Sequence, residues 1–157
     1  MTLLIIGIGQ SLRGDDSAGL AAVSHWLNTY PARAEQSTLR VVLAEVTGLG
    51  LLDELLGVET AILVDAVRSG VKKPGSLHLL REEDLATFSP GSTSAHGLGV
   101  AETLSLGRQI YPEEMPAKII LIGIEVGEIG LGKRLSPEVS ASLPSAAQMI
   151  EEQLSLL

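Results

Sequence analysis

The sequence predicts an α/β fold with a mostly parallel sheet, in a single domain that spans residues 1–157. Three observations support this prediction. Short aliphatic runs alternate with longer segments whose apolar residues recur at helical spacing. The first aliphatic run, residues 3–6, is apolar throughout, as expected for a strand that helices cover on both faces. A chain of 157 residues also suits one domain in which strands and helices alternate along the sequence.

The apolar patterns predict five strands, at residues 3–6, 39–44, 59–65, 76–80 and 117–124. The fourth is short and follows a Lys-Lys-Pro-Gly turn, so we expect it at an edge of the sheet. Helices are expected at residues 18–30, 49–56, 97–109 and 136–154. Ser136 and Pro137 suit the start of the last helix, and Pro144 should kink or split it. Surface connections are expected at residues 31–38, 72–75, 90–93, 112–116 and 127–132.

Composition excludes several classes of partner and chemistry. The net charge is −8 with only eleven Lys and Arg residues, which argues against nucleic acid or an anionic membrane as a partner. The chain has no Cys, so it has no disulfide and no thiol nucleophile, and four aromatic residues provide no platform for stacking bases. The sequence contains neither a long apolar run nor a basic leader. We therefore expect a soluble, cytoplasmic protein, and we expect it to be a monomer.

The stretch around which the chain is organised is LLIIGIGQSLRGDDSAG, residues 3–19, which predicts a strand, a glycine turn and a helix. Gly9 and Gly14 have the spacing of a phosphate-binding loop, but Asp15 and Asp16 stand where that motif needs Lys and then Ser or Thr. The dinucleotide pattern also fails, because Leu12 occupies the place of its third glycine. Two carboxylates there suggest a cation or a proton-transfer site. The alternative is that they only complement the dipole of the helix that follows.

Reactive side chains are expected outside the carboxyl ends of parallel strands, where sites form in such sheets. Asp16 follows the first strand, Asp65 closes the third, and His96 precedes a helix after the fourth. Taken singly, each has a structural interpretation: a helix-end acid, a hydrogen-bonded loop cap, and a core or helix-start histidine. Together, two carboxylates and an imidazole suit a first-row metal such as nickel or zinc. His25 and His78 are interpreted as structural or solvent-facing.

Other mechanisms find less support in the sequence. No serine stands in a G-x-S-x-G turn, including Ser11, Ser92 and Ser94, and no H-E-x-x-H motif is present. Asp15 and Asp16 are neighbours in sequence, so they are not expected to face each other as a catalytic dyad. The glycine-rich residues 127–132 are expected to form a mobile surface flap.

These motifs, in this order, resemble the hydrogenase maturation proteases, which trim the C-terminus of the large subunit of [NiFe]-hydrogenases. The resemblance covers nearly the whole chain and rests on GIGQSLRGDDSAG, VDA, KPGSLHLL, His96, LIGIEV and LSPEV. Two departures are Gln10, where the family usually has Asn, and residues 45–48, which replace a more glycine-rich turn. The resemblance implies a phosphorylase/hydrolase-like three-layer α/β/α fold with a twisted five-stranded sheet.

The resemblance also implies a metal site and a mechanism. Asp16, Asp65 and His96 match the metal ligands of the family, so they would act both as ligands and in catalysis. The substrate would be a large-subunit precursor whose own thiolates already hold nickel, and another divalent ion such as zinc or cadmium could occupy the ligands in crystals. Asp15 would be a supporting group beside them. Polarisation of a carbonyl or of bound water by the metal would assist peptide hydrolysis.

Two other functions stay open at this point. A chaperone that senses nickel without cutting would use the same ligands. A nucleotide or flavin binder could share a similar sheet, although acid at the phosphate position argues against it.

Overall fold

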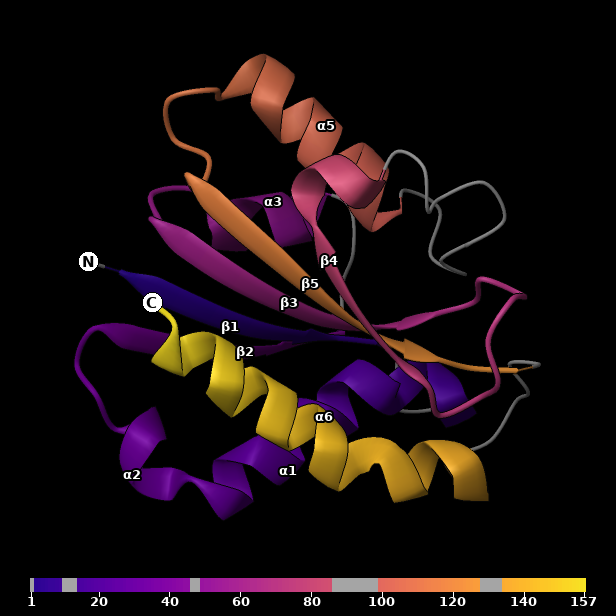
Figure 1. Cartoon of the computed structure of the whole chain (residues 1–157). Coiled ribbons are helices and arrows are strands. Elements are labelled where there is room, and N and C mark those ends of the chain that lie inside the picture. Colours follow the sequence, from indigo (N-terminus) through magenta and orange to yellow (C-terminus); the bar gives the residue numbers. More distant parts are fainter. Residues whose placement is uncertain (1, 10–13, 46–48, 86–98, 128–133) are drawn as a thin grey trace.

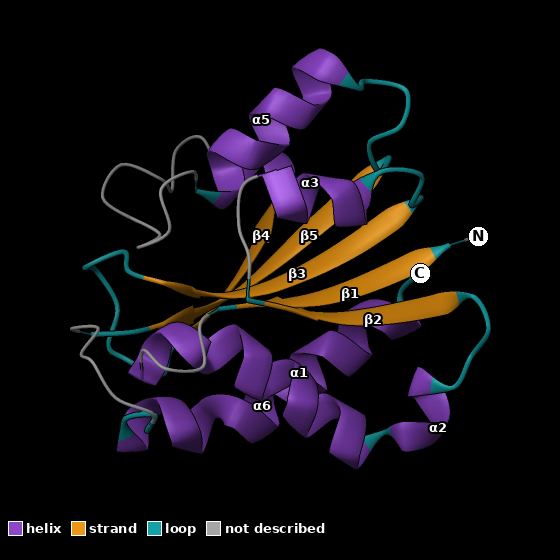
Figure 2. Cartoon of the chain, turned by 180° about the vertical axis from the view of Figure 1, so that it is seen from behind, coloured by secondary structure: helices purple, strands orange, loops and turns teal. Residues whose placement is uncertain are grey.

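The described residues form three layers, with a twisted sheet between two layers of helices (Figure 1). The computed structural model describes residues 2–9, 14–45, 49–85, 99–127 and 134–157. Helices α1 and α6 cover one face of the sheet, and α3 and α5 cover the other (Figure 2). This arrangement confirms the predicted three-layer α/β class.

The described part of the sheet has five strands: β1 (Leu3–Ile8), β2 (Leu39–Ala44), β3 (Thr60–Val67), β4 (Leu77–Arg81) and β5 (Lys118–Glu125). The α-helices are α1 (Ala18–Thr29), α2 (Pro31–Ala34), α3 (Leu49–Leu55), α5 (Val100–Ile110) and α6 (Pro137–Ser155). Two short 3-10 helices, η1 (Gly14–Ser17) and η2 (Glu82–Asp84), follow β1 and β4.

The strands lie in the order β2-β1-β3-β5-β4. The first four in this order are parallel, and β4 pairs with β5 antiparallel. All four parallel strands therefore end at the same side, which we call the carboxyl end of the sheet. The opposite side is the amino end. As predicted, β4 is an edge strand, and β2 is the other edge.

Alternating side chains along the central strands build a separate apolar core on each face. Ile5, Ile62 and Ile122 pack with Trp26 of α1 and with α6. Ile6, Leu63 and Leu121 point to the other face, where they pack with α3 and α5. Because both faces are covered, the central strands are apolar almost throughout, which is why the sequence predicted a parallel sheet.

Several expected elements differ from the structure. Strand β3 continues to Val67, so Asp65 lies inside the strand instead of closing it. Residues 31–34 of the expected connection form the short helix α2, which Pro31 begins with its fixed φ. Helix α6 is continuous through Pro144, so the expected split does not occur. Ser136 does cap α6, because its side chain accepts a hydrogen bond from the Val139 amide.

Several predictions fall outside the described residues. These include Gln10, Leu12, the expected loop at 90–93, and residues 128–132 of the expected flap. Among the helices of the described ranges, none has the length and apolar character that crossing a bilayer requires.

Candidate active site at the carboxyl end of the sheet

Glycines let the chain after β1 fold back closely onto the carboxyl end of the sheet. A Cβ on Gly19 would lie 2.2 Å from the carbonyl oxygen of Val64 and 2.4 Å from that of Ile8. A Cβ on Gly9 would lie 2.3 Å from the carbonyl oxygen of Asp16. The first turn of α1 therefore packs directly on the ends of β1 and β3, which places η1 against β3.

This packing brings two predicted site residues together. Asp16 on η1 and Asp65 on β3 are both buried, with 4% and 7% of their surface exposed. Burial raises the pKa of the Asp65 carboxyl well above its ordinary value. The charge of Asp16 raises it further, while a 2.8 Å hydrogen bond from the Ala66 amide lowers it. Because both carboxyl groups are buried and interact with each other, ionising Asp65 beside a charged Asp16 costs free energy.

The third predicted residue, His96, lies outside the described residues. Within the described ranges, no group of three or more histidine or acidic side chains is arranged to hold a metal ion. The convergence of Asp16 and Asp65 is therefore a structural finding. The three-ligand site that includes His96 stays a prediction.

Asp15 has a different environment from its neighbour Asp16. Its side chain is also buried, and its Oδ1 accepts a 2.6 Å hydrogen bond from the amide of Ser136. Ser136 is the N-cap of α6, so this carboxylate lies at the positive end of that helix. Asp15 therefore also complements the dipole of α6, a role that the sequence did not predict. Asp15 also fixes the position of η1, and with it Asp16.

A second buried group of polar residues lies on the same face of the sheet as Asp65. The register places Asp65 beside Gly123 of β5, and Gly123 beside His78 of β4. His78 Nε2 lies 2.8 Å from Glu125 Oε1, and both side chains are almost fully buried. His78 is therefore structural, and the alternative that it faces solvent is wrong.

Glu125 also holds the loop that follows β3. It accepts a 2.9 Å hydrogen bond from the Ser69 amide and another hydrogen bond from the Ser69 hydroxyl. Burial raises the pKa of Glu125, but the hydrogen bonds from Ser69, His78 and Gly70 outweigh this effect and lower it. Glu125 is thus held as a charged carboxylate. The sequence contains a signal for Glu125, because this acid ends an apolar run. Asp65 was expected to end its strand in the same way.

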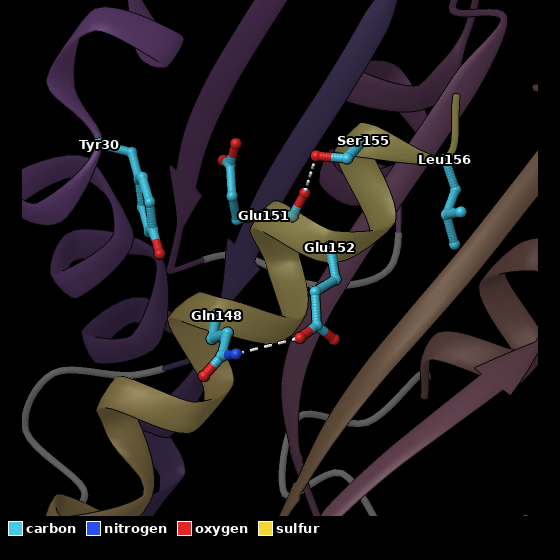
Figure 3. Close-up of a pocket in the computed structure, with 6 residues that line it drawn as sticks. All are labelled: Tyr30, Gln148, Glu151, Glu152, Ser155 and Leu156. Atoms are coloured by element: carbon cyan, nitrogen blue, oxygen red, sulfur yellow. Dashed lines mark hydrogen bonds between the residues drawn. The ribbon is translucent and has the colours of Figure 1, made fainter.

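A shallow hollow of about 430 Å³ lies at the amino end of the sheet, far from these acids. Figure 3 shows its lining, which comes from the end of α1 and the last turns of α6: Tyr30, Gln148, Glu151, Glu152, Ser155 and Leu156. Glu151 is held by Trp26 and Arg33, at 3.1 and 2.8 Å. Neither Asp16 nor Asp65 lines the hollow, so it is not the predicted site.

Comparison with known proteins decides the family. The family model for hydrogenase maturation proteases matches residues 24–153. The chain belongs to this family. This maturation protease is therefore a peptidase, as the sequence motifs predicted.

Individual relatives and solved structures agree with that assignment. The hydrogenase 2 maturation protease of Escherichia coli is 26% identical over 96% of this chain and 88% of its own length. The hydrogenase expression/formation protein HupD of Bradyrhizobium diazoefficiens is 28% identical over 96% of this chain and 78% of its own length. The structure of the Escherichia coli hydrogenase maturating endopeptidase HybD superposes with a TM-score of 0.82, at 25% identity, covering 99% of this chain and 93% of the other.

A second solved structure is also similar. The [NiFe] hydrogenase maturation protease HybD of Thermococcus kodakarensis has a TM-score of 0.73 at 28% identity, covering 98% of this maturation protease and 99% of that chain. The five-stranded sheet and its flanking helices are therefore those of the family.

Proposed function

We propose that this protease removes the C-terminal extension of a [NiFe]-hydrogenase large-subunit precursor that already carries nickel. Asp16, Asp65 and His96 add ligands to that nickel and thereby recognise the loaded precursor. The observation that supports this most is the convergence of Asp16 and Asp65, two buried acids from separate segments, at the end of the sheet where such folds bind their ligands.

The electrostatics of this acid pair favours a cation as the group recognised. The pKa of Asp65 is raised because its charge is poorly solvated and lies near Asp16. A divalent cation between the two carboxylates would reverse this effect and favour the ionised form, so that binding the metal releases the proton. Carboxylate and imidazole ligands suit nickel among the first-row metals.

The same electrostatics provides specificity. A precursor without nickel would cover Asp16 and Asp65 while bringing no positive charge to offset theirs, which disfavours its binding. When the loaded precursor binds, its nickel supplies Lewis acidity toward the scissile carbonyl or a bound water. The protein holds the metal-bound segment in place and excludes bulk water from the acids.

The test compares cleavage of nickel-loaded and nickel-free precursor by intact mass. We expect the wild-type protein to cut only the loaded precursor. Asp16→Asn, Asp65→Asn and His96→Ala should each lower the rate about 100-fold or more, since each removes a group that contacts the metal at the reacting centre. Asp53→Asn, which changes an exposed acid on α3, is the matched control and should cut at the wild-type rate.

Normal cleavage by all three site variants would contradict the proposal. A stable complex with the loaded precursor, without any loss of mass, would instead support the alternative of a nickel-sensing chaperone.

A further inference from the structure

The outer edge of β2 carries backbone hydrogen-bonding groups that no described strand uses. Among the described strands, β2 pairs only with β1. The Leu3 amide donates to Thr38 O at 2.9 Å, and the Gly9 amide donates to Ala44 O at 3.1 Å. Because alternate residues of a parallel strand bond to the same neighbour, the even-numbered residues of β2 face β1. The amides and carbonyls of Val41 and Leu43 therefore point outward.

This edge lacks the features that usually prevent another chain from adding to a sheet. Strand β2 contains no Pro and no Lys, and its single charged residue, Arg40, is engaged by Glu54 of α3. Instead, a large apolar side chain near its end is exposed. Leu43 is 48% exposed. An added strand could bury this side chain.

The outer edge of β2 ends at the same side of the sheet as the buried acids. Ala44, the last residue of β2, accepts the hydrogen bond from Gly9, and Gly9 packs against the backbone of Asp16. Neighbouring strands lie about 4.8 Å apart, so a chain added outside β2 would lie roughly 15 Å from β3, which carries Asp65. A few residues of extended peptide would cover that distance.

We propose that the outer edge of β2 binds the C-terminal extension of the precursor as an added, antiparallel strand. This inference rests on the proposed function, in which the nickel and the scissile bond share the carboxyl end of the sheet. Residues after the cut must leave that end, and along β2 they run toward the amino end, opposite to the strand. Leu43 would bond the extension first and Val41 next.

Binding of this kind depends mainly on backbone hydrogen bonds. It therefore predicts how many residues of the extension contribute to affinity. Backbone hydrogen bonds give affinity, and only alternate side chains of the added strand contact the sheet. Strand β2 has six residues and spans about 20 Å, so roughly six residues of the extension would contribute to binding. The sequence of the extension would matter less than its length.

The structure offers a matched pair of variants to test this. Leu43→Pro removes one outward amide from β2, and proline is tolerated in an edge strand where the amide faces solvent. Leu79 of β4 has the same exposure, 48%, on the opposite edge. The Glu125 amide donates to Ser76 O, so the antiparallel alternation places Leu79 in a non-bonded pair with its amide outward. Leu79→Pro is therefore the control.

The measurement is cleavage of the nickel-loaded precursor, after circular dichroism has compared the melting temperatures of both variants with the wild type. We expect Leu43→Pro to raise KM about tenfold with little change in kcat, which is the effect of losing an interaction that serves binding alone. Leu79→Pro should keep the wild-type KM. Wild-type KM should also rise when the extension is shortened to two residues, and Leu43→Pro should add nothing further to that rise.

The outcomes separate the two proposals. Failure of the wild-type protein to cut loaded precursor would overturn both. Cleavage with equal KM for wild type and Leu43→Pro, or for long and short extensions, would overturn the edge proposal alone. If sedimentation shows a dimer that Leu43→Pro dissociates while KM is unchanged, the edge binds a second copy and the proposal is wrong. The shortened substrate requires only the wild-type protein, so the test does not depend on the proline variant folding.

Discussion

At the scale of single residues, three acids at one end of the sheet have three different environments. Asp15 accepts a backbone hydrogen bond at the start of α6, Glu125 is held by Ser69 and His78, and Asp65 lies beside another acid. The pKa values of two of these acids diverge: that of Glu125 is lowered, and that of Asp65 is raised. Divergent pKa values among neighbouring acids are typical of sites where charge is used.

Asp65 should make the stability of the protein fall as pH rises. Below the ordinary pKa of 3.8, Asp65 is protonated in both the folded and the unfolded state and has no effect. As pH rises, the Asp65 carboxyl ionises in the unfolded chain before it ionises in the folded protein. The free energy of unfolding therefore falls until the pH passes the raised pKa that Asp65 has in the folded protein. Asp65→Asn should abolish this fall and be more stable than wild type at pH 8 by roughly 1–3 kcal/mol.

Urea unfolding between pH 4 and pH 8 checks this prediction, with Asp53→Asn as the control. The difference between Asp65→Asn and wild type should grow with pH and then level off. A difference that stays constant across this range would show that Asp65 is not the titrating group.

Of the buried polar residues at this end of the sheet, the sequence indicated Asp65 but not Glu125 or His78. Asp65 was identified because a carboxylate at the end of an apolar run is costly to bury without a purpose. Glu125 carries the same signal but was missed, since the expected strand stopped at residue 124, one residue short of it. Its partner His78 could not be found in this way. Strand pairing in register, which local sequence does not encode, brings them together.

At the scale of elements, the close contact of α1 with the sheet is the feature that places Asp16. Most elements could be predicted because their apolar period is strong, including β2, whose bounds match those expected. The differences arose where tertiary packing extends an element. Strand β3 gains residues 66 and 67 because β5 continues beside it, and Val126 donates a 2.9 Å hydrogen bond to Val67 O.

Gly19→Ala should disrupt this contact. The new Cβ would meet two backbone oxygens within 2.4 Å, which cannot rotate away, so α1 must move off the sheet. We expect a loss of about 2–4 kcal/mol in the free energy of unfolding and a fall in cleavage rate, because η1 moves with α1. Gly127→Ala is the control, since its Cβ would lie at an ordinary 3.5 Å from Pro74.

Chemical unfolding and precursor cleavage measure the two effects. A Gly19→Ala protein with the stability of Gly127→Ala would contradict the packing described here.

At the scale of the whole molecule, the two ends of the sheet differ in character. The carboxyl end gathers the buried acids, and the amino end has a shallow hollow between Tyr30 and α6. The sequence predicted that Asp16 and Asp65 lie at the same end of the sheet, because parallel strands place their following loops on one side. It could not predict the hollow, which forms only when α6 packs along α1.

Changes in the hollow should therefore leave the reaction unaffected. The double variant Gln148→Ala and Glu152→Ala removes a 3.1 Å surface hydrogen bond between exposed side chains. We expect cleavage of loaded precursor within about twofold of wild type and stability within about 0.5 kcal/mol. A tenfold fall in kcat/KM without a change in melting temperature would instead assign the hollow a part in substrate binding.

The hydrogen bond between Asp15 and the Ser136 amide joins groups 121 positions apart. During synthesis on a ribosome, the nascent chain would present β1, η1 and β3 well before α6 emerges. The anchor that holds η1 in place is therefore made among the last contacts, and a half-made polypeptide would lack an ordered set of acids. The acids would then reach their final arrangement only when the fold is complete.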